Sequence, residues 1–194
     1  MLEVKNAKVY DLKESIIACR NAMRTDMPDY NSDEEFSKGL CRAIKLVEAS
    51  KKTSGHANFR TGIRVSFDLK YTQYITKQFQ RYHWFDYVSS SSMMHRIIEM
   101  DFSKCCNKYV LPEVKNIMKT CVDVYNTHPT YENYMRIISN CPMGAELFVR
   151  VSTNYEQLAT IYKQRRSHKL KEDWGAFIAF IESLPYAKEL IIGE

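Results

Sequence analysis

The sequence of 194 residues lacks several features that would assign a function class directly. No stretch reaches the roughly 18 consecutive apolar residues that a membrane-spanning helix needs, and the opening M-L-E-V-K is not a signal peptide. Six cysteines include no C-x-x-C pair, so we expect reduced thiols instead of a disulfide framework or a zinc site. Glycine-rich phosphate loops, H-E-x-x-H motifs and EF-hand loops are also missing. We therefore expect a cytoplasmic protein with no metal and no membrane partner.

Glycine and proline are scarce, with six and five residues, while 45% of the chain is hydrophobic and 26% is charged. This composition excludes a disordered or fibrous chain. The length suits one domain over residues 1–194. Twenty-eight basic and 23 acidic residues leave a net charge of +5, which is modest for a nucleic-acid-binding protein.

The positive charge is concentrated in one run, residues 163–171, which holds Lys163, Arg165, Arg166, His168, Lys169 and Lys171. One interpretation is a solvated helix face. The other is a small anion site, because guanidinium groups match phosphate geometry. A nucleic-acid-binding domain would also use such a run, but no recognised nucleic-acid module accompanies it. We do not expect a nucleic-acid partner.

Hydrophobic periodicity predicts an α+β fold, a single mixed domain with strand–helix units and long helices. Strict alternation predicts strands, and apolar positions at helical spacing predict helices. The expected strands are residues 2–10, 63–70 and 147–152, and the expected helices are 33–51, 71–82, 112–125, 131–139 and 155–181.

Local signals refine these elements. Asn31-Ser32-Asp33 caps the helix over 33–51, which should bury Phe36, Leu40, Ile44 and Val47 on one side, and residues 53–56 should end it. Pro112 suits a first helical turn, and Asn154 is a natural N-cap for the last long helix. Residues 84–94 show no clear period, and the four serines over 89–92 favour a loop. The strand–helix units over 63–82 and 146–181 both deliver polar residues near a strand-to-helix junction.

Four segments resemble the flavin-dependent thymidylate synthase family, in the family's order. Gly55-His56 precedes an alternating strand, and Q-F-Q-R-Y-H over 78–83 with the following serines resembles Q-W-x-R-H-R and R-H-R-x-x-S-x-N-E-x-S-x-R. A-C-R-N-A over 18–22 resembles A-A-R-V-S, and R-I-I over 136–138 resembles R-I-V-L-P. The last segment, Thr153-Asn154 through Arg165, His168 and Glu172, is similar to V-N-x-R-S-L…L-R…H-A-Q-x-E.

The resemblance implies a homotetramer that binds FAD and a pyrimidine nucleotide, dUMP, where subunits meet. Such enzymes reduce the flavin with NADPH, take a one-carbon unit from methylenetetrahydrofolate and make dTMP without a cysteine nucleophile. The short chain would suit a phage gene. A Cys105-Cys106 nucleophile is not expected, since no histidine lies at useful spacing.

The same resemblance assigns roles to individual residues. Arg165 and Ser91 would be catalytic. The substrate would be bound by Gln78, Arg81, Ser91, Arg96, Arg136 and Arg165. The cofactor would be bound by His56, Arg81, His83, Asn154 and His168. Paired arginines and directed donors are what a nucleotide phosphate in a partly dry cleft needs.

The departures from the family pattern fall mainly on the flavin side. Tyr82 and His83 stand where the family has His and Arg, Ala22 replaces a serine, and Glu156 replaces an arginine that faces the flavin phosphate. Met93 stands at the position of the last arginine of the family motif. Arg96, three residues later, would substitute for that arginine if the loop is longer. Two hypotheses remain open: a divergent synthase, or a non-catalytic nucleotide-binding member of the same fold that has lost flavin chemistry.

Overall fold

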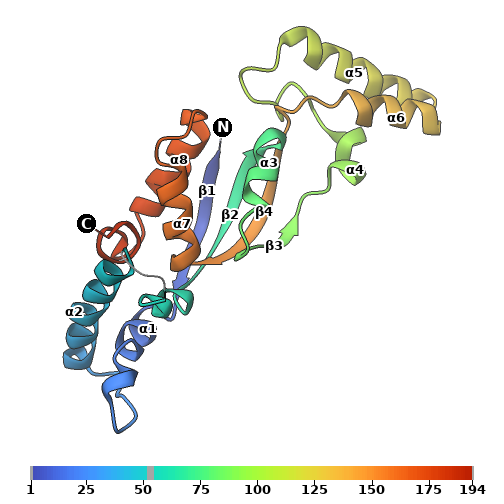
Figure 1. Ribbon diagram of the computed structural model, residues 1–194. Coiled ribbons are helices and arrows are strands. Elements are labelled where there is room, and N and C mark those ends of the chain that lie inside the picture. Colours follow the sequence, from blue (N-terminus) through green and yellow to red (C-terminus); the bar gives the residue numbers. More distant parts are fainter. Residues whose placement is uncertain (1, 52–54, 194) are drawn as a thin grey trace.

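A four-stranded antiparallel sheet forms the centre of the computed structural model, which describes residues 2–51 and 55–193 (Figure 1). The strand order is β1-β2-β4-β3, and the strands are β1 (Glu3–Tyr10), β2 (Arg64–Thr72), β3 (Phe85–Ser90) and β4 (Glu146–Asn154). The central strands β2 and β4 pair without interruption from Arg64 opposite Asn154 to Thr72 opposite Glu146. Each of these two strands runs directly into a helix, α3 or α7.

The helical elements, in chain order, are α1 (Leu12–Ala18), η1 (Asn21–Met23), α2 (Asp33–Ser50), η2 (Asn58–Thr61), α3 (Gln73–Phe79), α4 (Met93–Arg96), η3 (Ile97–Glu99), α5 (Pro112–Thr127), α6 (Tyr131–Asn140), α7 (Tyr155–Arg165), α8 (Lys171–Glu182) and the π turn η4 (Lys188–Ile192). In the part of the chain that the structure describes, no helix has the length and apolar character to cross a membrane.

The main core lies between the sheet and the helices that cover one face of it. Alternate residues of β2 point into this core, and Val65, Phe67 and Leu69 have no exposed surface. They meet an aromatic cluster in which Phe79 stacks on Phe85 at 4.9 Å and lies 4.8 Å from Trp174. Burying these large rings is the main source of stabilisation for this layer.

A second, smaller core lies away from the sheet and is built by α5, α6 and the segment before them. Figure 1 shows α4, α5 and α6 standing apart from α7 and α8. Met118 and Ile137 have no exposed surface in this core, and Phe102 packs with them. The chain enters it after β3 and leaves it into β4, so β3 and β4 connect the two cores.

The predicted α+β class is confirmed, and so are the strands expected over 2–10, 63–70 and 147–152. Two predicted caps are also present: the Ser32 side chain accepts a hydrogen bond from the Glu35 backbone N–H, and the Asn154 side chain accepts one from Gln157. Pro112 opens α5, and α6 matches the helix expected over 131–139. Of the expected helix-breaking segment 53–56, Thr53 and Ser54 lie outside the described residues.

The loop expected over 84–94 is wrong over most of its length, because residues 85–90 form β3 and residues 93–94 begin α4. The register of β3 against β4 shifts between Tyr87 and Ser89. Such a bulge places two residues opposite one and breaks the two-residue period. The alternation therefore gave no strand signal there, although Ser91 and Ser92 do lie beyond the strand.

Three helix predictions also need correction. The helix expected over 71–82 is shorter, because α3 ends at Phe79. The helix expected over 155–181 is two helices, because α7 ends at Arg165 and α8 starts at Lys171. This break lets the buried face of α8 pack back on the sheet side. In α2, Val47 is buried and Phe36 and Leu40 pack half-buried against the main core as expected, whereas Ile44 is 40% exposed and Gly39 and Ala43 are buried.

The glycine at position 39 of α2 lies against the backbone of α1. A Cβ at position 39 would lie 2.7 Å from the carbonyl oxygen of Ile16 and 3.1 Å from the Cα of Ile17. Both neighbours are backbone atoms of α1, so neither can move aside easily. Only glycine therefore permits α1 and α2 to approach this closely.

We predict that Gly39→Ala destabilises the protein by about 1–3 kcal/mol, the usual cost of overpacking a contact that cannot relax. The matched control is Gly175→Ala in α8, where an added Cβ meets nothing within 4 Å. That substitution should stabilise the protein by about 0.5–1 kcal/mol, because alanine favours a helix over glycine. Urea unfolding of both variants measures the difference. Equal effects would contradict the close-approach explanation.

Candidate functional site

The end of α7 carries a network of polar and aromatic side chains around Arg165. The Arg165 Nε donates a hydrogen bond to the Tyr82 hydroxyl oxygen at 2.7 Å. That hydroxyl donates in turn to the Gln164 Oε1 at 3.1 Å. Tyr82 is only 8% exposed and follows α3 closely. The network therefore joins the segment after α3 to the last turn of α7.

Trp174 of α8 completes this network from the core side. The Arg165 guanidinium carbon lies 4.7 Å from the Trp174 ring centroid and 5.7 Å from that of Tyr82, within the range of cation–π attraction. The Trp174 indole nitrogen donates a hydrogen bond to the Gln78 Oε1 at 3.0 Å. Because Trp174 is 1% exposed, its ring is held by the core. One buried indole thus orients both Gln78 and Arg165.

A cavity of about 550 Å³ opens beside this network, and we call it the Arg165 cavity. Its lining residues are Arg81, Tyr82, His83, Gln157, Thr160, Gln164 and Arg165, with no carboxylate among them. Within residues 2–51 and 55–193, the two terminal nitrogens of Arg165 make no hydrogen bond or ion pair with protein. Arg165 therefore brings two nitrogen donors without a protein partner to a cavity that has no carboxylate in its lining, which suits an anion.

His168 lies on the Trp174 side of the same region. Its ring centroid is 6.0 Å from that of Trp174, and its Nδ1 accepts a hydrogen bond from the Leu170 backbone N–H at 3.1 Å. Burial, and then the positive charges of Arg165 and Lys169, hold the pKa of His168 below its ordinary value. The imidazole is therefore biased toward its neutral form.

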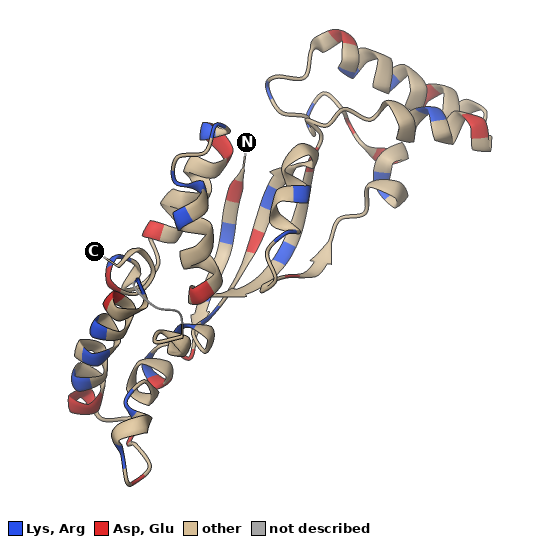
Figure 2. Ribbon diagram, viewed as in Figure 1, with Lys and Arg blue, Asp and Glu red and all other residues tan. Residues whose placement is uncertain are grey.

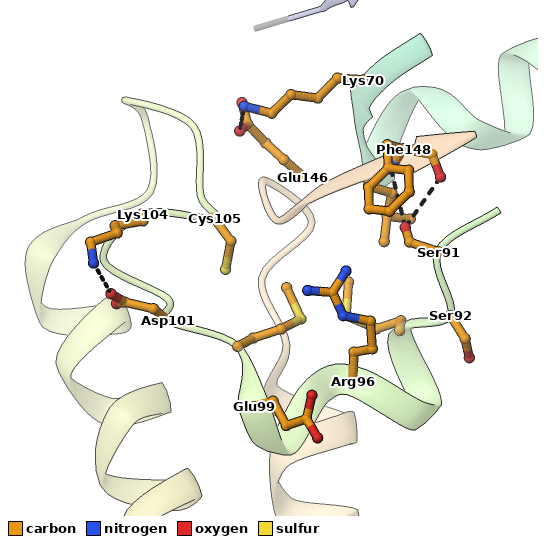
Figure 3. A pocket seen from close by; sticks show the side chains of 13 residues that line it. Lys70, Ser91, Ser92, Arg96, Glu99, Asp101, Lys104, Cys105, Glu146 and Phe148 are labelled. Atoms are coloured by element: carbon orange, nitrogen blue, oxygen red, sulfur yellow. Dashed lines mark hydrogen bonds and ion pairs between the residues drawn. The ribbon is translucent and has the colours of Figure 1, made fainter. Parts of the chain in front are cut away.

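Ser91 and Arg96 lie in a different cavity, of about 430 Å³, which we call the Ser91 cavity (Figure 3). The Ser91 hydroxyl accepts a hydrogen bond from the Phe148 backbone N–H at 3.1 Å and lies 3.2 Å from its carbonyl oxygen. The Arg96 guanidinium lies 6.0 Å from the Phe148 ring centroid. At the rim, Lys70 forms an ion pair with Glu146 at 2.6 Å.

The remaining predicted site residues lie elsewhere. Arg136 is exposed on α6 and forms an ion pair with Glu132 at 2.6 Å. His56 is exposed and lines a separate cavity of about 460 Å³ together with Ala22. Asn154 is 2% exposed, and its side chain caps α7. A flavin contact by His56 or Asn154 and a nucleotide contact by Arg136 therefore stay predictions.

The structure thus places Arg81, His83 and Arg165 in one cavity and Ser91 with Arg96 in another. Gln78 and His168 line neither cavity and are linked to Arg165 through Trp174. Sequence reasoning missed the residues that hold the first group, Tyr82, Gln164 and Trp174. Tyr82 was noted only as a departure from the family motif. Nothing in the spacing of the sequence links Trp174 to Gln78, which is 96 positions away.

The thiols of Cys105 and Cys141 lie in surroundings that disfavour the thiolate. Burial raises the pKa of Cys105 to about 12 and that of Cys141 to about 11, so both thiols stay protonated at neutral pH. Among residues 2–51 and 55–193, no three side chains of His, Cys, Asp or Glu are close enough together to hold a metal ion.

Comparisons with known proteins give the fold. No protein-family model and no curated protein sequence matches this chain. Among solved structures, it is similar to a crystal structure of flavin-dependent thymidylate synthase from Helicobacter pylori complexed with FAD and dUMP, with a TM-score of 0.72, 14% sequence identity and 98% coverage of both chains. A second structure of the Helicobacter pylori enzyme with FAD and dUMP has a TM-score of 0.69 and 16% identity, covering 99% of this chain and 98% of that one. The likeness establishes that this chain has the same fold.

The effect of the Arg165 charge on the pKa of His168 leads to a testable expectation. Replacing Arg165 with Gln removes one positive neighbour, so the pKa of His168 should rise toward its ordinary value of 6.5. Lys171→Gln removes a charge from the same basic run, but Lys171 is not among the groups that lower the His168 pKa, and it serves as the control. Imidazole NMR titration measures both. An unchanged His168 pKa in the Arg165 variant would contradict the described arrangement.

Proposed function

We propose that this protein is a flavin-dependent thymidylate synthase-like enzyme that reductively methylates dUMP to dTMP. In this proposal methylenetetrahydrofolate is the carbon donor, and NADPH is the reductant through FAD. The observation that carries the proposal is Arg165, which lines a carboxylate-free cavity together with Arg81 and whose two terminal nitrogens have no protein partner among the described residues. The shared fold with enzymes crystallised with FAD and dUMP supports the same function.

The residues around Arg165 suit a uracil nucleotide. Because the Gln78 Oε1 accepts the Trp174 hydrogen bond, the amide N–H groups of Gln78 remain to donate to an acceptor such as a uracil carbonyl. Arg165 would donate to the base or phosphate, and its fixed positive charge would stabilise negative charge that develops on the ring during chemistry at C5. Tyr82 and Trp174 fix the orientation of the Arg165 guanidinium before the nucleotide binds, which lowers the entropy cost of nucleotide binding.

The separation of the two cavities favours a site shared between copies of the chain. Ser91 and Arg96 are proposed to contact the same nucleotide as Arg165, yet the Ser91 and Arg165 cavities share no lining residue. Arg136 is in neither cavity. A homotetramer in which one copy contributes Arg165 and another contributes Ser91 and Arg136 would bring these groups onto one ligand.

FAD fits part of the proposed site. Arg81, His83 and His168 would hold it near the nucleotide, and the carboxylate-free lining of the Arg165 cavity suits a diphosphate-bearing group. His56 would contribute from its own cavity. When bound, FAD would pass reducing equivalents from NADPH to the reaction at the nucleotide.

We predict that Arg165→Ala lowers the affinity for dUMP at least thirtyfold. Removing one partner of a desolvated charge pair costs roughly 2–5 kcal/mol. Lys169→Ala is the control, because Lys169 belongs to the same basic run but is exposed and outside the Arg165 cavity. Isothermal titration calorimetry with dUMP measures both variants, and thermal melting checks their folding. Unchanged dUMP affinity in Arg165→Ala would disprove the assignment.

A second candidate function rests on the start of α7. Glu156, where the related family has an arginine, forms an ion pair with Arg60 at 2.5 Å, and Asn154 uses its side chain to cap the helix. These two positions therefore serve the fold in this chain. The observation favours a repurposed nucleotide-binding protein that keeps Gln78, Arg81 and Arg165 but has lost flavin chemistry.

Flavin retention separates the two candidates. For the enzyme, we expect flavin absorbance bands to co-elute with the protein after FAD is added and the excess is removed by gel filtration. Addition of dUMP, methylenetetrahydrofolate and NADPH should then yield dTMP. A colourless protein that still binds dUMP through Arg165 would contradict the enzyme and support the second candidate.

A further inference from the structure

The basic run at the end of α7 divides between two cavities. Arg165 lines the Arg165 cavity, whereas Lys163 and Arg166 line a second one of about 470 Å³, which we call the Lys163 cavity. It is lined by residues of α7, the end of α2 and η4, and η4 packs against both helices. Figure 2 shows the acidic residue at the start of α7 and basic residues toward its end. The proposed function does not use Lys163 or Arg166.

The Lys163 cavity combines this positive charge with an apolar wall. Val47 of α2, Ala159 of α7 and Ile191 of η4 line it, and Val47 and Ile191 are 3% and 4% exposed. Its volume is in the range of small-molecule sites, which combine apolar walls with a few placed polar groups. The cavity is therefore larger than a simple inorganic ion needs.

The carboxylate in the lining of the Lys163 cavity, that of Glu156, is neutralised by Arg60. Glu156 Oε2 accepts a hydrogen bond from the Arg60 Nε at 2.7 Å, and Arg60, 7% exposed, also donates to the Leu190 carbonyl oxygen at 3.3 Å. All three guanidinium nitrogens of Arg60 thus have protein partners. Glu156 consequently contributes little repulsion to an anion in the cavity.

Lys163 and Arg166 are left as the available cations. Lys51 also lines the cavity, but its ammonium group forms an ion pair with Glu48 at 2.5 Å. For Lys163 and Arg166, the part of the chain that the structure describes holds no carboxylate within ion-pair distance. The two side chains are one helical turn apart, so they lie on the same side of α7.

We infer that the Lys163 cavity, which shares only the lining residue Thr160 with the Arg165 cavity, binds an organic phosphate in addition to the nucleotide proposed at Arg165. Lys163 and Arg166 meet the phosphoryl group, and Val47, Ala159 and Ile191 contact the apolar body. The ion pair between Arg60 and Glu156 forms another part of the cavity wall. A charge that only complements the dipole at the end of α7 would need neither the cavity nor the apolar wall.

The test uses phenyl phosphate and inorganic phosphate as probes on the full chain carrying Arg165→Ala, which disables the first cavity. Isothermal titration calorimetry at low salt should show phenyl phosphate binding at least fivefold more tightly than inorganic phosphate. Adding Lys163→Gln and Arg166→Gln together should weaken phenyl phosphate binding at least tenfold. Because the first cavity is disabled, failure of the function proposed at Arg165 does not affect this result.

The matched control is the pair Lys169→Gln and Lys171→Gln, which removes the same charge from exposed residues of the same run. It should change the affinity less than twofold. Methyl NMR provides a readout without the double variant, since phenyl phosphate should shift the Val47 and Ile191 methyl signals. Equal loss in both double variants, equal affinity for the two probes, or unshifted methyl signals would overturn the inference.

Discussion

The nine-residue pairing of β2 with β4 is the constraint from which the candidate site follows. β2 continues into α3 and β4 continues into α7, so the register of the two strands fixes where both helices begin. Two hydrogen bonds then connect the segment after α3 to the end of β4 and the start of α7: Thr153 Oγ1 donates to the Trp84 carbonyl oxygen, and the Trp84 N–H donates to Gln157 Oε1. A slip by one residue would turn Val149 and Val151 to the other face of the sheet and separate Tyr82 from Arg165.

Trp174 links this framework to the charged groups. One side of the indole packs in the aromatic core, 4.8 Å from Phe79, and its nitrogen and ring contact Gln78 and Arg165. The core is close-packed, so the ring cannot shift without disturbing many neighbours. Arg165 therefore gains its orientation from core packing, and the polar face of the site keeps its geometry before any ligand arrives. The side chain of Tyr82, buried at the same junction, adds the hydrogen bond that fixes the rotation of the guanidinium.

The sequence could predict the elements whose signals are local. Alternation located β2 and β4, Ser32 and Asn154 marked helix starts, and the order of family-like segments selected Gln78, Arg81 and Arg165. It could not predict β3, because a bulge removes the period. Nor could it predict the break between α7 and α8, since the turn over 166–170 is set by the packing of α8. The division of the basic run between two cavities depends on that break and on side-chain direction, which a one-dimensional charge count does not contain.

The geometry of α7 explains how its two ends can change independently. Position 156 lies in the first turn and Arg165 in the last, nine residues apart, or roughly 14 Å at 1.5 Å per residue. A substitution at 156 can therefore be compensated locally, as Arg60 does here for Glu156, without altering the Tyr82 and Trp174 contacts of Arg165. The first turn makes contacts within the fold, a cap by Asn154 and the half-buried ion pair of Glu156 with Arg60. The last turn retains donors that no described protein group satisfies, and ligand recognition at this helix is accordingly expected at its C-terminal end.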